Sequence, residues 1–179
     1  MADNEIPAGD AAANTARIAA IDVGSNSVRL VVAEGLPSGG YRVLDEEREN
    51  TRLAASMVAT GQLSDEAVEA TIGALRRFLS IATGYGVERV AAIATSAVRD
   101  AENGRQFCDR VRRELSLDVE VISPDEEARL AFLSVARAFD VTGREVAVAD
   151  IGRGRTRSIL PPPRVGGQKY NTPPRPGPR

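Results

Sequence analysis

Two short phrases in the chain combine a carboxylate with glycine or small polar residues, a combination suited to binding phosphate. In residues 18–27 an apolar run is followed by Asp22, Gly24, Ser25, Asn26 and Ser27. In residues 146–152 a second apolar run ends in Asp150, Ile151 and Gly152. An Asp at the end of a buried strand suits a metal or a water molecule, and glycine lets backbone N–H groups approach phosphate oxygens. One copy would indicate an ordinary tight turn, whereas two copies favour a two-lobed phosphate site.

Two further segments carry groups suited to phosphate chemistry, and each also has a simpler explanation. Hydroxyls at Thr95 and Ser96 precede Arg99, whose guanidinium group suits bidentate contacts with phosphate. A helix cap beside a surface arginine accounts for the same residues. Residues 125–127 place acids at a helix start, where the helix dipole alone favours them. The alternative is a carboxylate, Glu127, that orients an attacking water.

The composition excludes several kinds of site. The chain has no histidine, which removes His-based acid–base catalysis, and its one cysteine, Cys108, excludes an intrachain disulfide and a Cys-cluster zinc site. Residues 1–152 hold all 25 acidic residues but only 16 of the 23 basic ones, a net charge of −9, which gives no reason to expect nucleic acid as a partner. With no signal peptide and no long apolar span, we expect a cytoplasmic protein that does not contact the membrane.

The periodicity of apolar residues predicts an α/β fold in the order β-β-β-α-β-α-β-α, followed by a further strand. The expected strands cover residues 18–21, 28–34, 41–47, 90–94, 119–122 and 145–151. The expected helices begin at Ser64 and end at Gly84 or Gly86, and cover residues 103–115 and 126–139. Three antiparallel strands continued by αβ units are typical of the ribonuclease-H-like lobe of the actin, sugar-kinase and Hsp70 superfamily. We expect residues 1–16 to be a disordered leader.

Taken together, residues 22–27, 94–103 and 125–130 resemble three motifs of the exopolyphosphatase/guanosine pentaphosphate phosphohydrolase family. The resemblance runs from about Ile18 to Gly152. It implies that Glu127 is the catalytic carboxylate and that Asp150 associates with Mg²⁺. It also implies a set of phosphate-binding residues: Asp22, Gly24, Ser25, Asn26, Ser27, Arg99 and Gly152. The implied reaction removes a terminal phosphate from inorganic polyphosphate or from guanosine pentaphosphate, and full-length members are expected to be homodimers.

The chain departs from the family pattern at residue 153. The family continues its second loop as Asp-Ile-Gly-Gly-Gly-Ser-Thr-Glu and then through a second lobe, whereas here Arg155 and Arg157 replace the serine and the acid. A Pro-, Gly- and Arg-rich stretch follows, and such a composition does not form a packed core. Either this is a native basic tail that attracts polyphosphate, or it results from a reading-frame change near codon 153, which we favour.

These observations predict four segments and three functional alternatives. We expect a first lobe over residues 17–140, the opening strand and loop of a second lobe over 141–152, and a disordered tail over 153–179. The leading hypothesis is a truncated phosphohydrolase with weak activity or none. The alternatives are a non-catalytic module that binds phosphate or polyphosphate, and the N-terminal half of a sugar-kinase-like enzyme.

Overall fold

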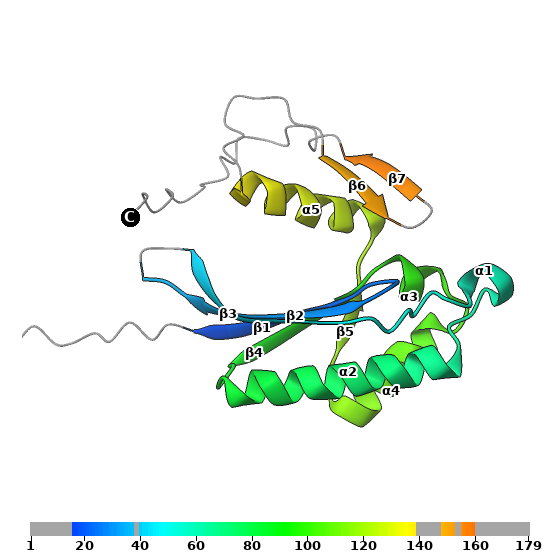
Figure 1. Ribbon diagram of the computed structural model, residues 1–179, viewed down its shortest axis with the longest axis horizontal. Helices are drawn as coiled ribbons and strands as arrows, with labels where there is room; N and C mark the ends of the chain where they lie inside the picture. Colours follow the sequence, from blue (N-terminus) through cyan, green and yellow to red (C-terminus); the bar gives the residue numbers. More distant parts are fainter. Residues whose placement is uncertain (1–15, 38–39, 139–147, 153–154, 160–179) are drawn as a thin grey trace, which may run out of the picture.

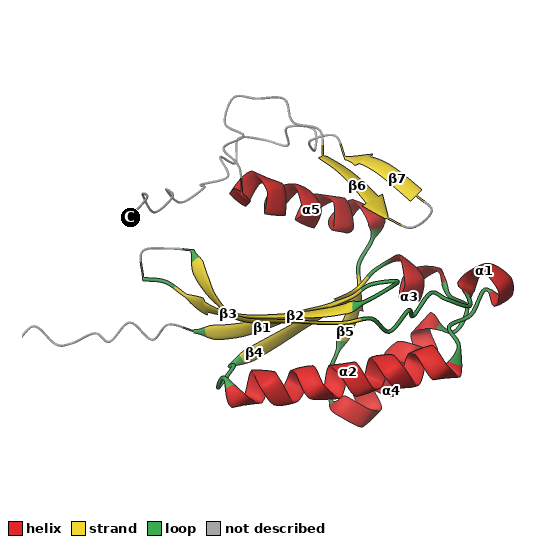
Figure 2. Ribbon diagram, in the orientation of Figure 1, coloured by secondary structure: helices red, strands yellow, loops and turns green. Residues whose placement is uncertain are grey.

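A five-stranded sheet forms the centre of the computed structural model, which describes residues 16–37, 40–138, 148–152 and 155–159. The strand order is β3-β2-β1-β4-β5 (Figure 2). The strands are β1 (Arg17–Val23), β2 (Val28–Gly35), β3 (Tyr41–Glu49), β4 (Arg89–Ala94) and β5 (Val119–Val121). β1, β2 and β3 pair antiparallel, whereas β4 pairs parallel with both β1 and β5. This arrangement confirms the predicted α/β, ribonuclease-H-like lobe.

The parallel pairing decides where the candidate site lies. β1, β4 and β5 run in the same direction, so the residues that follow Val23, Ala94 and Val121 all leave the sheet at one edge. Asp22 lies next to the last residue of β1 and the first loop follows that strand, whereas Arg99 follows β4 and Glu127 follows β5. Three segments that are distant in sequence therefore meet at the carboxyl ends of the parallel strands, where open α/β sheets commonly bind ligands.

Two helices, α2 (Asp65–Gly84) and α4 (Gly104–Leu115), lie on one side of the sheet, and α5 (Pro124–Ala138) lies on the other (Figure 1). α2 begins as predicted, because the Ser64 hydroxyl accepts a hydrogen bond of 3.3 Å from the backbone N–H of Ala67. The core between the sheet and α2 and α4 contains fully buried Ile21, Leu30, Leu75, Phe78 and Val111. Alternation along β1 thus leaves Asp22 on the opposite face, together with Ala20.

Two short helices were absent from the prediction. α1 (Met57–Thr60) and α3 (Ser96–Asp100) contain only four and five residues, too few to show helical periodicity in the sequence. The boundaries of the longer elements differ from those expected by at most two residues, as is usual at helix and strand ends. α3 matters for the site, because it starts directly after β4 and presents Arg99 in its last turn.

The expectation of a disordered tail over residues 153–179 does not hold for residues 155–159. They form a strand, β7 (Arg155–Ile159), that pairs antiparallel with β6 (Val148–Gly152) in a separate two-stranded sheet. An isolated β6 would leave its backbone N–H and C=O groups without partners, and β7 satisfies those on one edge despite its arginines. Residues 145–147 of the expected strand, the expected leader up to residue 15 and the tail from residue 160 lie outside the described residues.

Over the part of the chain that the structure describes, no helix has the length and apolar character needed to span a membrane.

Candidate phosphate-binding site

The loop between β1 and β2 has a backbone shape that requires glycine at its start. The N–H of Gly24 donates a hydrogen bond of 3.1 Å to the carbonyl oxygen of Ser27, which closes the loop. A Cβ atom on residue 24 would lie 3.0 Å from that same oxygen, closer than ordinary contacts allow. The loop therefore holds its remaining polar groups in a compact turn, as predicted from the Asp-Val-Gly-Ser-Asn-Ser phrase.

The segment that follows β3 holds this loop from outside. The backbone N–H of Arg52 donates to the carbonyl oxygen of Asn26 at 3.0 Å, and that of Ala54 donates to the carbonyl oxygen of Ser25 at 2.9 Å. Two carbonyl groups of the loop are thus engaged. Ser27 is buried, while Ser25 and Asn26 keep partial exposure. The polar face of the loop remains available to a ligand.

The first loop and the segment after β4 contact each other through their hydroxyl groups. The Oγ atoms of Ser25 and Ser96 lie 3.2 Å apart, and either can donate the hydrogen bond. The Thr95 N–H also donates to the carbonyl oxygen of Val23 at 3.4 Å. Two of the three motifs singled out in the sequence therefore form one continuous surface.

Arg99 brings the third motif to the same place. Its Nη1 atom donates to the carbonyl oxygen of Ile122 at 2.9 Å and to Oε2 of Glu127 at 3.3 Å, and its Nε atom lies 3.6 Å from Oδ1 of Asp100. The Arg99 side chain is only 18% exposed. In the structure it positions Glu127, and its expected contact with phosphate stays a prediction.

Glu127 lies in the first turn of α5, beside Asp125 and Glu126. Its backbone N–H donates to the carbonyl oxygen of Ser123 at 2.9 Å, which fixes the start of the helix. Glu126 differs from Glu127 in its contacts, since both oxygens of its carboxylate pair with Arg129, one turn along the same helix. Among the acids of this turn, Glu127 is the one that Arg99 links to the strand ends.

The Glu127 carboxylate acts electrostatically on Asp22. Burial raises the pKa of the Asp22 carboxyl above its usual value; Arg29, its register partner on β2, opposes that rise and the Glu127 carboxylate adds to it. The position of Arg29 was missed in the sequence, although it could have been found from the hairpin register. A cation near the Asp22 carboxylate would favour its ionised form. Mg²⁺ suits this position, because proteins often hold it by one or two carboxylates plus phosphate oxygens.

Mg²⁺ bound by protein side chains alone has less support. In residues 16–37, 40–138, 148–152 and 155–159, no three or more carboxylate, thiol or imidazole side chains are arranged so that they could hold a metal ion. The donors present at the first loop therefore fit a cation shared with a bound phosphate.

The second loop is described only through its backbone. In the β6–β7 hairpin Asp150 lies opposite Arg157 and Gly152 opposite Arg155, and β6 contacts α5. The register repeats that of the first hairpin, where Asp22 lies opposite Arg29. The expected roles of Asp150 and Gly152 stay predictions.

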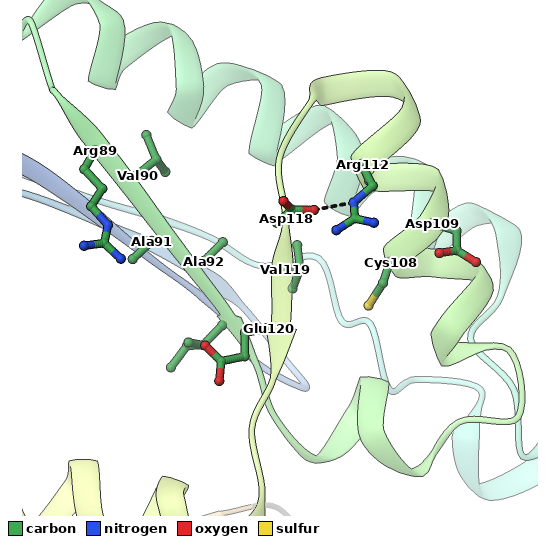
Figure 3. Close-up of a pocket in the computed structure, with 11 residues that line it drawn as sticks. Arg89, Val90, Ala91, Ala92, Cys108, Asp109, Arg112, Asp118, Val119 and Glu120 are labelled. Atoms are coloured by element: carbon green, nitrogen blue, oxygen red, sulfur yellow. Dashed lines mark hydrogen bonds and ion pairs between the residues drawn. The ribbon is translucent and has the colours of Figure 1, made fainter.

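A groove of about 480 Å³ lies elsewhere, between α4 and strands β4 and β5 (Figure 3). It contains charges of both signs, including Arg89 and Glu120 and an ion pair between Arg112 and Asp118. Cys108, on its wall, packs against the core, and burial raises the pKa of its thiol. The groove shares none of its lining residues with the first loop, Arg99 or Glu127, and its mixed charges do not suit a polyanion.

Comparison with known proteins agrees with this geometry. The model of the Ppx/GppA phosphatase family matches residues 30–161, a range that starts after the first loop and continues past Gly152 through β7. Exopolyphosphatase 1 of Mycobacterium tuberculosis (strain ATCC 25618 / H37Rv) is 33% identical over 138 residues, which are 77% of this chain and 40% of the relative.

Solved structures agree as well. The Aquifex aeolicus member of the Ppx/GppA family is 40% identical with a TM-score of 0.72, over 80% of this chain and 46% of that one. An exopolyphosphatase from Cytophaga hutchinsonii ATCC 33406 is 30% identical with a TM-score of 0.76, over the same shares of the two chains. The chain thus spans less than half of the length of these relatives. With the family model matching most of its length, the chain belongs to the Ppx/GppA phosphatase family.

Proposed function

We propose that this chain carries the first half of an exopolyphosphatase site, which hydrolyses the terminal phosphoanhydride bond of inorganic polyphosphate. The observation that carries the proposal is the contact between Arg99 and Glu127, which holds this carboxylate near enough to Asp22 to act on its charge. Polyphosphate is favoured as the substrate because the curated relatives compared above are exopolyphosphatases.

The proposed chemistry follows from the positions of these groups. Ser25, Asn26 and the backbone of the first loop bind the terminal phosphate. Glu127 orients a water molecule and accepts one of its protons as the water oxygen attacks the terminal phosphorus. The bond between that phosphorus and the bridging oxygen breaks, and the shortened polyphosphate leaves with the bridging oxygen as an anion. Arg99 keeps Glu127 in place throughout, since it is bonded at once to the end of β5 and to the carboxylate.

Mg²⁺ bound by Asp22 and the substrate would offset the negative charge that develops on the phosphate oxygens. We assign the same role, binding Mg²⁺ together with the substrate, to Asp150 of the second loop. The buried position of Asp22 beside Glu127 supports the first assignment. Asp150 is assigned by its equivalent place, opposite an arginine in a strand hairpin.

The test is release of phosphate from long-chain polyphosphate by the full chain, with and without Mg²⁺. We expect slow release that depends on Mg²⁺ and is lost in Glu127→Gln, a change that keeps the size of the side chain. Glu126→Gln is the matched control, because Glu126 pairs with Arg129 within its own helix and should leave release unchanged. Equal rates in Glu127→Gln and the wild type would contradict the proposal.

Two further measurements separate the remaining alternatives. Guanosine pentaphosphate, offered in place of polyphosphate, tests whether the terminal phosphate of the alarmone is cleaved by the same residues. Binding of polyphosphate without release, unaffected by Glu127→Gln, would instead favour the non-catalytic binding module. Transfer of phosphate to a sugar in place of water would favour the kinase alternative.

A further inference from the structure

Arg52 has an unusual backbone conformation beside the phosphate loop. Its φ angle is 51°, in the left-handed region that side chains other than glycine rarely adopt. In the described residues only one other non-glycine residue, Ser116, has a positive φ, and it ends α4 as a left-handed cap. Arg52 ends no helix, so helix capping does not explain its conformation.

The surroundings of Arg52 hold this conformation in place. On one side its N–H bonds to the Asn26 carbonyl of the loop, and Thr51 and Leu53 on either side of it are buried. The backbone between two buried side chains has little freedom, so the strain is maintained by packing. Strained non-glycine residues that persist in this way are concentrated at ligand-binding and active sites.

The side chain of Arg52 is free to act. It is exposed, and within the described part of the chain it makes no ion pair. The backbone of Arg52 is fixed beside the first loop. An exposed, unpaired guanidinium group on such a backbone is suited to an oxygen of a phosphate bound at that loop.

We propose that Arg52 binds substrate phosphate at the rim of the first loop and that its left-handed backbone serves to hold the side chain there. This inference rests on the proposed function, since it assigns one more residue to the same substrate. The sequence analysis did not single out this arginine, because neither its φ angle nor its bond to Asn26 has a signature in the chain.

The test is the affinity of the full chain for inorganic polyphosphate at fixed ionic strength, measured for the wild type, Arg52→Gly and Arg52→Lys. Glycine adopts a φ of 51° without strain, so Arg52→Gly removes the guanidinium group while keeping the backbone and its bond to Asn26. We expect affinity to fall about tenfold in Arg52→Gly, the size of one charge-assisted hydrogen bond, with thermal stability unchanged or raised. Lysine should recover part of the affinity, because it keeps the charge but loses the bidentate geometry.

The matched control is Arg113→Ala, at the end of α4 that faces the other edge of the sheet, where an exposed arginine of equal charge is removed. Its affinity should equal that of the wild type. Equal affinities in Arg52→Gly and the wild type would overturn the inference while leaving the proposed function intact. A loss of affinity in Arg113→Ala equal to that in Arg52→Gly would also overturn it, because the loss would then come from net charge in general. A wild-type chain that does not bind polyphosphate would overturn both.

Discussion

The Nη1 atom of Arg99 lies 2.9 Å from the carbonyl oxygen of Ile122 and 3.3 Å from Oε2 of Glu127. One guanidinium group thereby connects α3, the residue after β5 and the first turn of α5. Without Arg99, the carbonyl oxygen of Ile122 would lose this hydrogen-bond donor and Glu127 would lose its charged partner. The orientation of the proposed catalytic carboxylate therefore depends on a residue from a different strand end.

This relationship predicts that Arg99→Ala destabilises the fold more than Glu127→Gln does. Alanine removes the donor of Ile122 and the partner of Glu127 together, at a cost of about 1–3 kcal/mol, because a half-buried carbonyl and a carboxylate both lose a hydrogen bond. Glu127→Gln keeps an oxygen that can accept from Arg99. Urea unfolding of the two variants measures the difference, and equal stabilities would contradict the linking role of Arg99.

A second prediction concerns Asp22 and pH. Burial raises the pKa of Asp22, and Glu127 adds to the rise, so ionisation of this group costs stability in the folded state. The stability that the neutral Asp22 carboxyl provides is fully present below the pKa of this group in the unfolded chain, about 4. It is lost as the pH rises through the higher pKa that the group has in the folded protein. Asp22→Asn should therefore be more stable than the wild type at pH 7, and the difference should vanish toward pH 3. Thermal unfolding across this range would show a constant difference if the pKa of Asp22 were not raised.

Glu34 should show the opposite dependence. Hydrogen bonds from Arg42 and then from Arg17 hold the pKa of Glu34 below its usual range, and its side chain is only 11% exposed. The stability that the ionised form provides is present above the unfolded pKa, about 4.3, and is lost as pH falls through the lower folded pKa. Glu34→Gln should thus be less stable than the wild type at pH 7 and should approach it in acid. A stability difference that grows as pH falls would refute this.

The fold followed from the sequence to a large extent, because its elements are long and periodic. The Ser64 cap and the apolar stripe that includes Ile72 and Leu75 predicted α2, and the glycine loop after Asp22 predicted the first hairpin. β7 could not be found in this way. Its alternation of arginine with threonine and serine does not resemble a buried strand, and its pairing depends on the open edge of β6.

For the candidate site, the sequence indicated which segments come together but not the contacts that their side chains make, and the roles of the residues stay predictions. The three motifs meet as expected, since parallel strands bring their carboxyl ends to one edge. However, a sequence does not reveal which acceptor an arginine reaches, so Arg99 was expected on phosphate and is found on Ile122 and Glu127. Asn103, noted as part of a motif, donates to and accepts from the backbone of Leu63 at 2.9 Å, which makes it a structural residue.

A fourth prediction follows from two arginines that lie opposite each other. Arg29 on β2 and Arg48 on β3 are register partners, and both are exposed. Like charges directly across two strands are destabilising, so Arg48→Thr should raise the free energy of unfolding by about 0.2–1 kcal/mol at low salt. The gain should shrink in 1 M salt, where the charges are screened. Unfolding at two salt concentrations checks both statements, and a gain independent of salt would assign it to the strand propensity of threonine instead.

The last prediction compares two glycines in helices. A Cβ atom on Gly104, the first residue of α4, would lie 1.9 Å from the carbonyl oxygen of Val98 in α3, so the two helices approach each other only because this residue has no side chain. The obstructing atom belongs to the backbone and cannot rotate away, and Gly104→Ala should cost at least about 2 kcal/mol as α3 and α4 separate.

Gly73, in α2, is the matched control, because its Cβ would meet only the Arg77 side chain at 3.7 Å. Gly73→Ala should therefore stabilise the protein by about 0.5–1 kcal/mol, as expected for alanine in a helix interior. Because α3 carries Arg99, Gly104→Ala should also reduce polyphosphate hydrolysis, whereas Gly73→Ala should leave it unchanged. Equal and small effects of the two substitutions on stability would mean that α3 and α4 are not in such close contact.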